Sequence, residues 1–539
     1  MLACGSDAEV SAERRHSVDT EVADAGSGEA EPDAAQTSAE PTPSDAGASM
    51  GAQPPAATKS KAATPATKKP SQPVVAQPSA AATDSQQRAQ TERAPGDADR
   101  GRSLLLNNGT EAVPYLSCGV PKSVVESLHA IGIEALGNNP RMPERLRGNA
   151  ELPYQFSYAK TRAGVEVVTA NCLLCHASQL GDSLVVGLGN PNMDFTKANS
   201  GLLGFSGIAE DLLRLALKPE ERTELDRALR LNRAGADTER PDTIGLNPAD
   251  AVFTVLAAHR DPETLVWRDE RDPKADAHFD QVFTDVPPWW NMHRRERMFY
   301  NGFGRGTHAR IMMTASLMCL DDVQEAEAID AYFPDIEAYI KSLRPPRYED
   351  VARRSIDMAR AERGGKLYAE NCTSCHGDSQ QAPREDVLLQ DVGTDPAYAV
   401  AGSVQGAGAV EYFFSFFNRS WYGTHGRSAQ LERTQEPSYA APPLVGVWAT
   451  APYFHNASVP TLEAVLDPTL RPNIYRRSTD PKTYDFERLG WPYEEVESKG
   501  DDISVYDATR PEYLNTGHTF SADFTADERR DLLEYLKTL

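Results

Sequence analysis

The sequence is short of basic residues, of cysteines and of long apolar runs. Lys and Arg number 55 against 79 Asp and Glu, which gives a formal charge of −24. A surface of this sign does not neutralise a phosphate backbone, so the composition argues against nucleic-acid binding. There is no apolar run of the roughly 18 residues that a membrane-spanning helix needs. The 539 residues leave room for two or three domains with a sizeable core.

The first hundred residues lack the side chains from which a core is built. Residues 1–100 contain no Phe, Trp, Tyr or Ile, and Leu2 is their only leucine. Such a segment cannot bury enough apolar surface to offset the entropy of an ordered chain. Residues 1–100 are therefore predicted to be a disordered tether, with the folded part beginning at residue 101.

One of the seven cysteines, Cys4, lies at the start of this tether. The segment from Met1 to Ser6 resembles the end of a bacterial lipoprotein signal, in which a small residue precedes a cysteine that becomes lipidated. The basic and apolar regions that normally come before such a cysteine are not in the sequence. A lipid on Cys4 would anchor the chain to a membrane and leave the folded part in the periplasm or at the cell surface. The alternative is an incidental cysteine near a terminus.

Four cysteines form two copies of the motif C-x-x-C-H. The copies are Cys172–His176 and Cys372–His376. Two thiols at this spacing can add to the two vinyl groups of one porphyrin, and the histidine then supplies an imidazole to the iron. The sequence therefore predicts two covalently bound haem c groups, held by Cys172, Cys175, Cys372 and Cys375, with His176 and His376 as iron ligands. The alternative for either motif is a redox pair or half of a zinc site.

A second repeated element indicates that each C-x-x-C-H motif belongs to a cytochrome c domain of its own. The segments 337–343 and 534–539 share the pattern Tyr-apolar-Lys-Ser/Thr-Leu, and Thr525 with Glu528 predicts a capping box before the second. Such a segment resembles the closing helix of a cytochrome c domain. Pro345 and Pro346 cannot continue the first helix. The prediction is a mainly α fold with two cytochrome c type domains, residues 101–346 and 347–539, each carrying long insertions.

Few segments alternate as strands do, so helix and loop are expected to dominate. Helices are predicted at 251–259, around 311–313 and at 361–368. The two remaining cysteines, Cys118 and Cys319, would form a disulfide if the chain folds outside the cytoplasm, where such bonds persist. Two buried free thiols are the alternative.

The second iron needs a further ligand, and elimination narrows the set of residues that could supply it. No methionine follows Met358, so a ligand from the second domain must be a histidine. The candidates are His425, His455 and His518. We favour His518, in the segment Asn515–His518, with His455 as the alternative axial ligand.

The first iron is less constrained. Several residues of its domain could bind the iron, and a five-coordinate iron is equally allowed. These residues are Met193, His259, Met292, His293, His308, Met312 and Met313. The aromatic residues between Trp289 and Phe303 would suit a dry distal pocket, although they could also simply pack the core.

The segment 441–462 carries a resemblance to a known family. From Trp448 to Leu462 it reads W-A-T-A-P-Y-x-H-N-x-S-V-P-T-L, and N-x-G-H (515–518) and Y-L-K-T-L (535–539) follow. These runs are similar to the di-haem cytochrome c peroxidase superfamily, which includes the enzyme that matures methylamine dehydrogenase. Within it they look most like the extracellular rubber oxygenases.

This resemblance implies different roles for the two haems. The N-terminal haem, on His176, would bind O2 beneath a distal phenylalanine, here Phe299 or Phe303. The C-terminal haem would be held by His376 and His518. The second domain lacks the methionine ligand of the classical peroxidases, which weakens the case for peroxide as the substrate.

The function hypothesis is an exported di-haem c-type cytochrome oxidoreductase. Haem 1 would react with O2 or H2O2 and oxidise an organic substrate, and haem 2 would supply or store an electron. The expected partners are O2 or H2O2, an unknown reductant or organic substrate, and a redox-partner protein. An apolar pocket without a clear general base favours O2 over cleavage of peroxide. The alternatives are a di-haem cytochrome c peroxidase, an electron-transfer lipoprotein without catalysis, and a structural surface protein with vestigial motifs.

Overall fold

The computed structural model describes residues 96–110, 112–130, 136–146, 148–197, 214, 217–234, 238–278, 282–406, 410–426 and 429–539. The predicted lipid site at Cys4 and nearly all of the predicted tether lie outside the described residues. Residues 98–100, counted with the tether on composition, form the first turn of a helix. No helix of the described part is long and apolar enough to cross a bilayer.

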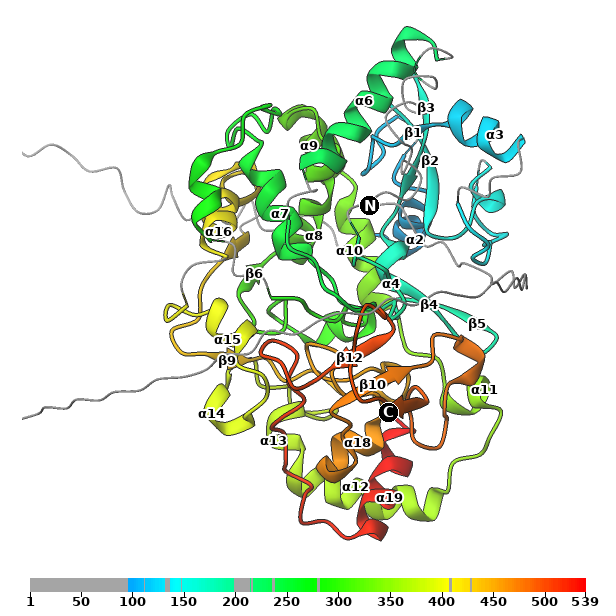
Figure 1. The fold of residues 1–539 in the computed structure, drawn as a ribbon, viewed down its shortest axis with the longest axis vertical. Coiled ribbons are helices and arrows are strands. Elements are labelled where there is room, and N and C mark those ends of the chain that lie inside the picture. The colour runs from blue at the N-terminus through cyan, green and yellow to red at the C-terminus, as the bar shows by residue number, and fades with distance from the viewer. Residues whose placement is uncertain are drawn as a thin grey trace, which may run out of the picture. The chain divides into compact units, whose positions relative to one another are not determined.

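Two crossed helix pairs are the main repeat of the fold (Figure 1). In the first half α2 (Ala98–Leu106) packs against α10 (Phe333–Ser342), and in the second half α12 (Met358–Asn371) packs against α19 (Ala526–Leu536). The predicted closing helices are thus α10 and α19, and Pro345 follows the end of α10 as expected. Thr525 and Glu528 form the predicted capping box of α19.

Each pair crosses at a glycine that sits against the backbone of the partner helix. A Cβ on Gly101 would lie 1.8 Å from the carbonyl oxygen of Asp335, and a Cβ on Gly364 would lie 2.0 Å from that of Asp531. No side chain tolerates such a distance, so glycine is what lets the helices approach. Each glycine follows an arginine, and that arginine binds the carboxylate of the aspartate on which the glycine packs. Arg100 binds Asp335, and Arg363 binds Asp531.

The two halves differ in what separates the first helix from the C-x-x-C-H motif. In the second half α13 (Thr373–His376) follows α12 directly. In the first half residues 107–171 intervene. They include α3 (Lys122–Ala130) and an antiparallel sheet of order β1-β3-β2, formed by β1 (Val120–Pro121), β2 (Phe156–Lys160) and β3 (Glu166–Ala170). Strand β3 leads into α4 (Leu173–His176).

The other elements of the first half, most of them short, surround this frame, and the 16-residue α6 (Pro219–Ala234) is the exception. They are η1 (Asn149–Glu151), β4 (Ala177–Leu180), β5 (Ser183–Val186), α6 (Pro219–Ala234), α7 (Ala249–Ala258), η2 (Pro273–His278), η3 (Trp289–Arg294), β6 (Gly304–Gly306), α8 (His308–Met312), η4 (Met313–Met318) and α9 (Val323–Asp330). The helices predicted at 251–259 and around 311–313 are confirmed as α7 and α8. The chain has more strands than the sequence indicated, because several are only two to five residues long.

The second half adds a similar set of short elements, of which α11 precedes α12 and the others follow α13. They are α11 (Tyr348–Ala352), β7 (Val387–Leu388), α14 (Leu389–Val392), α15 (Ala397–Ala401), α16 (Glu411–Arg419), α17 (Trp421–Thr424), β8 (Ala429–Leu431), β9 (Ser438–Tyr439), η5 (Val447–Ala449), α18 (Leu462–Leu466), η6 (Pro468–Leu470), β10 (Ile474–Arg477), η7 (Pro481–Thr483), β11 (Tyr493–Glu495) and β12 (Val505–Asp507). Strands β11, β10 and β12 form a second antiparallel sheet in that order.

The segment from α16 to β8 belongs to the core of the first half. Phe413 of α16 stacks on Phe253 of α7 with 5.7 Å between ring centroids, and β8 pairs with β6. The guanidinium of Arg310 lies 4.0 Å from the ring centroid of Trp421. The largest apolar cluster therefore contains residues from both halves of the chain.

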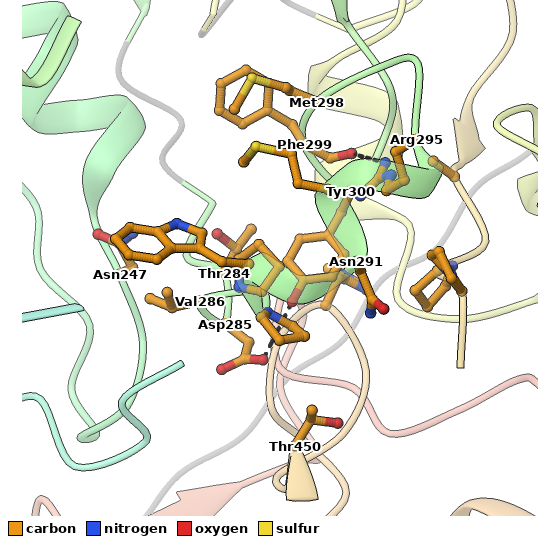
Figure 2. Close-up of a pocket in the computed structure, with 18 of the residues that line it drawn as sticks. Asn247, Thr284, Asp285, Val286, Asn291, Arg295, Met298, Phe299, Tyr300 and Thr450 are labelled. Atoms are coloured by element: carbon orange, nitrogen blue, oxygen red, sulfur yellow. Dashed lines mark hydrogen bonds between the residues drawn. The ribbon is translucent and has the colours of Figure 1, made fainter. Parts of the chain in front are cut away.

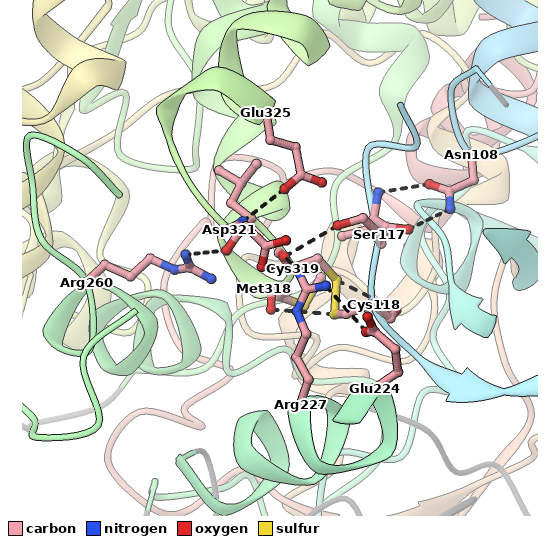
Figure 3. The surroundings of a disulfide bond; sticks show 12 residues. Asn108, Ser117, Cys118, Glu224, Arg227, Arg260, Met318, Cys319, Asp321 and Glu325 are labelled. Carbon is pink, nitrogen blue, oxygen red and sulfur yellow. Dashed lines mark hydrogen bonds and ion pairs between the residues drawn. A yellow bond between two sulfur atoms is a disulfide. The ribbon is translucent and has the colours of Figure 1, made fainter. Parts of the chain in front are cut away.

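A disulfide joins Cys118 to Cys319 (Figure 3), as expected if the chain folds in an oxidising compartment. It ties the start of the inserted segment 107–171 to the loop after η4. Two arginines hold that loop from the other side: Arg227 donates to the carbonyl of Cys319, and Arg260 donates to that of Leu320 at 2.6 Å.

Candidate haem-binding site

The second C-x-x-C-H motif presents an imidazole whose ring is already oriented. His376 follows Cys375 at the end of α13, and its Nδ1 lies 2.8 Å from the carbonyl oxygen of Pro442. A carbonyl only accepts, so Nδ1 carries the proton and Nε2 keeps its lone pair. Burial lowers the pKa of His376, which keeps the ring neutral. A neutral imidazole with a free Nε2 is what an iron ligand requires.

His518 lies across from His376. The ring centroids are 6.1 Å apart. A metal ion bound at about 2 Å from one nitrogen of each ring separates the centroids by about 6 Å. Within the described chain, no hydrogen-bond partner reaches the buried Nδ1 of His518, so the ring is not committed elsewhere. The pair therefore fits an iron held from both sides.

The loop that carries His518 is fixed by its backbone. Gly517 packs so closely on Gly393 that a Cβ would lie 2.1 Å from the carbonyl carbon of Gly393. The amide of His518 donates to Val392 at 2.6 Å, and Arg471 donates to the carbonyl of Gly517 at 2.7 Å. His518 itself has a φ of +47°. These contacts hold the imidazole in place before any ligand binds.

The alternative ligands are arranged differently. His455 is buried, and its Nε2 lies 3.0 Å from the hydroxyl of Tyr439. That contact occupies a nitrogen that a metal would need. His425 follows α17, with its Nδ1 3.0 Å from the hydroxyl of Thr424. Because His518 faces His376 and has no such partner, it is the better placed of the three candidates.

The first C-x-x-C-H motif lies in α4, where Asn171 sets its start. The side chain of Asn171 accepts from the amide of Leu173 at 2.9 Å and donates to Ser157 of β2 at 2.8 Å. His176 stacks on Trp289, with 4.4 Å between centroids and 19° between planes. Burial lowers the pKa of His176 to about 3, so this ring is neutral as well. In the described part of the chain, no histidine ring faces His176 as His518 faces His376.

Both motifs line one cavity of about 630 Å³. Cys172, Cys175 and His176 contribute from the first half, and Cys372, Cys375, His376 and His518 from the second. Most other lining side chains are apolar, and Met298, Met312 and Met318 are among them. An apolar chamber with a thiol pair and an imidazole at each of two places has the residues that attach a porphyrin through thioethers.

Phe299 and Phe303 both line this cavity. Their rings stack with 4.4 Å between centroids, and Phe303 also packs on Phe414 at 4.6 Å. Phe299 has a φ of +72°, and Gly304 makes room for its ring. The structure thus brings both candidate residues to the chamber. Their role over an iron stays a prediction.

Sequence reasoning missed the polar residues of the chamber (Figure 2). The hydroxyl of Tyr300 donates to the carboxylate of Asp285 at 3.3 Å. Burial raises the pKa of Asp285 to about 8 and that of Asp250 to about 6. Both carboxyl groups line the cavity, so it is less uniformly apolar than the sequence indicated. Neither aspartate belongs to a motif, and only the folded chain brings them to the site.

The comparisons with known proteins agree with a cytochrome c interpretation. Residues 438–476 match the model of the RoxA-like, cytochrome c-like family. The matched stretch contains the whole of the segment 441–462 that carries the resemblance to di-haem peroxidases, including His455. The match supports a haem c protein related to that superfamily and an oxidoreductase function of this general kind.

Two curated relatives come from Sinorhizobium fredii (strain NBRC 101917 / NGR234). The uncharacterized protein y4iM is 28% identical over 293 residues, which is 48% of this chain and 65% of the relative. The uncharacterized protein y4iJ is 28% identical over 282 residues, which is 42% of this chain and 46% of the relative. The chain thus spans less than two thirds of the length of either.

Among solved structures, the chain is similar to a MauG-like protein associated with microbial copper homeostasis. The identity is 18% and the TM-score 0.26, over 48% of this chain and 74% of that one.

Proposed function

We propose that the chain is an exported di-haem c-type cytochrome oxidoreductase related to the rubber oxygenases. One haem is attached at Cys172 and Cys175 with His176 as its ligand, and it reacts with O2 or H2O2. The other is attached at Cys372 and Cys375 with His376 and His518 as ligands, and it transfers electrons. The observation that carries the proposal is the 6.1 Å separation of His376 and His518 in a cavity shared with the first motif.

The two sites support different roles because their histidines have different neighbours. His376 faces a second imidazole, and ligation from both sides leaves no position for a substrate. His176 stacks on the indole of Trp289, and the aromatic pair Phe299 and Phe303 lines the same chamber. An iron with one open position is reactive toward dioxygen or peroxide, whereas a six-coordinate iron exchanges electrons.

The residues of this chain would provide the surroundings of the first site. Trp289 holds the ring of His176 by stacking, which fixes its orientation. The apolar wall, including Phe303 with 2% of its surface exposed, excludes water. Burial raises the pKa of Asp285 to about 8, which favours its protonated form, and its Oδ2 accepts from the hydroxyl of Tyr300. The chamber therefore combines an apolar lining that excludes water with one polar edge, which carries the carboxyl group of Asp285 and the hydroxyl of Tyr300.

Location outside the inner membrane is part of the proposal. The disulfide between Cys118 and Cys319 is of a kind that persists in oxidising compartments. A lipid at Cys4 would tether the folded part through residues 1–95. Mass spectrometry of the N-terminal peptide tests this, since a diacylglyceryl or acyl adduct on Cys4 is expected, and an unmodified cysteine contradicts it.

Low-temperature EPR of the oxidised protein tests the division of roles. One high-spin ferric signal and one low-spin signal of equal intensity are expected. The competing function is electron transfer without catalysis, which the methionines Met298 and Met312 favour because each lines the cavity and carries a thioether. Two low-spin signals would establish that alternative. A colourless preparation without a Soret band would remove both.

A further inference from the structure

Arg295 lines the cavity that the two attachment motifs share, and Figure 2 shows its hydrogen bond to the backbone of Phe299. It follows η3, whose first residue, Trp289, stacks on His176. The neighbouring Arg294 donates to the carbonyls of Asp378 and Gln381, just after His376. Only 9% of the Arg295 side chain is exposed. A permanent positive charge is therefore buried beside both candidate cofactor positions.

The charge of Arg295 is only partly compensated. Its Nη2 donates to the carbonyl oxygen of Phe299 at 2.6 Å, which is a neutral partner. The nearest carboxylate is Glu385, whose Oε1 lies 3.9 Å from Nε, beyond hydrogen-bond distance. Nε itself is buried and has no hydrogen-bond partner in the described chain. Burial also lowers the pKa of Arg295, because the charged form is desolvated.

Glu385 has other partners to satisfy. Its Oε1 accepts the backbone amides of Glu296 and Arg297, each at 3.0 Å, and its Oε2 lies 3.7 Å from Nε of Arg297. One carboxylate thus serves two arginines and two amides. Arg297 has 30% of its side chain exposed and is solvated as well. Arg295 has little access to water, so its guanidinium is the one whose charge is left only partly compensated.

A carboxylate is the anion that this site fits best. The guanidinium presents a planar fork of N–H groups that matches two carboxylate oxygens. The chamber wall includes the apolar side chains of Met298 and Phe299, while Tyr300 and Tyr398 also lie close enough to interact with the guanidinium. The expected ligand therefore has an apolar body and a carboxylate edge.

We propose that Arg295 binds the carboxylate of a ligand inside the chamber, which under the proposed function is a haem propionate. The same chemistry is offered by a free organic acid that enters the chamber as a substrate. The inference rests on the proposed function for the presence of haem. Counting the haems of the wild-type protein first tests that function separately.

The test compares Arg295→Gln with the matched control Arg297→Gln in the holoprotein. Removing a buried positive charge, and with it the partner of a propionate, favours the ferric state. Arg295→Gln is expected to shift the reduction potential of one haem to a lower value in spectroelectrochemical titration. Arg297→Gln should leave both potentials unchanged, because that side chain is solvated. Equal shifts in the two variants, or no shift in either, would exclude a propionate as the ligand of Arg295. The benzoate titration then decides whether a free acid binds there.

Sodium benzoate distinguishes the two sources of the carboxylate. If a propionate holds Arg295, benzoate should leave the Soret band of the wild-type protein unchanged. A saturable change in the wild type that is lost in Arg295→Gln assigns the site to a free acid instead. No response to benzoate together with unchanged potentials overturns the carboxylate site altogether.

Arg295→Lys provides a second variant in case the glutamine variant does not fold. It keeps the charge but loses the fork of N–H groups. A smaller shift of the same haem in the same direction is expected. A potential equal to that of the wild type would show that no bidentate partner exists.

Discussion

The two helix pairs are built in the same way but serve their attachment motifs differently. In both, an arginine before a glycine binds an aspartate on the closing helix, as Arg100 binds Asp335 and Arg363 binds Asp531. In the second half the first helix continues into the motif. In the first half β3 leads into it, after the insertion 107–171. The helix crossing is thus independent of how the motif is positioned.

The surroundings of the two histidines extend this comparison. His376 is oriented by a backbone carbonyl and faces His518, whereas His176 is oriented by stacking on Trp289. One site is prepared to hold a metal from two sides and the other from one. Four predictions below would break or sharpen this contrast, beginning with the largest effect.

Loss of one thiol pair is expected to remove one haem and no more. The double variants Cys172→Ala/Cys175→Ala and Cys372→Ala/Cys375→Ala should each lose about half of the haem absorbance, because each motif attaches its own group. Intact-protein mass spectrometry, which counts covalent haems, gives the same answer independently. Full retention in either variant would mean that its motif binds no haem.

His518→Ala should convert the second site alone to an open one. Among the described residues its imidazole is the one that lies opposite His376, so its removal is expected to replace the low-spin EPR signal by a high-spin signal. The control is His455→Ala, which removes the bond to Tyr439 and should leave the low-spin signal in place. The reverse result would assign the ligand to His455.

A methyl group at either crossing glycine should separate the helices. Gly101→Ala and Gly364→Ala place a Cβ within 2.0 Å of a backbone oxygen, so we expect a loss of about 3 kcal/mol in the free energy of unfolding. Gly365→Ala is the matched control, since its Cβ would meet the ring of Tyr535 at 3.2 Å and that side chain can move. Denaturant unfolding measures all three. Equal effects at 364 and 365 would contradict the tight crossing.

Asp531→Asn should cost less and should depend on pH. Arg363 lowers the pKa of Asp531, with a further contribution from Arg360, so its ion pairs stabilise the fold above the unfolded pKa of about 4. This contribution is lost as the pH falls through the lower folded value. We expect Asp531→Asn to lose about 2 kcal/mol at pH 7, with a difference from the wild type that shrinks below pH 4 in denaturant unfolding. A difference independent of pH would exclude the ion pairs as its cause.

Local signals in the sequence predicted the parts of the fold that lie close together along the chain. The closing helices, the capping box of Thr525 and the helix α7 could each be predicted from a short segment. The first helix α2 was missed because 65 residues separate Leu106 from Cys172. The shared Arg-Gly pair at 100–101 and 363–364 was the available signal.

The candidate site likewise contains residues that the sequence predicted and residues that it did not. The elimination of methionine left three histidines, of which His518 was favoured, and the structure places that residue opposite His376. Nothing in the sequence indicated Asp285 or Arg295, because their importance depends on burial and on partners far along the chain. Packing of α16 against α7 also depends on long-range contacts, which no local pattern encodes.

The packing of α16 and α17 into the first half has a consequence for biogenesis. Phe413 and Trp421 complete walls whose other sides are formed by α7 and α8. During synthesis these walls stay incomplete until the chain has been made well past the second motif. Under the proposed function, both porphyrins can therefore be joined to a chain that is still open, and later folding encloses them.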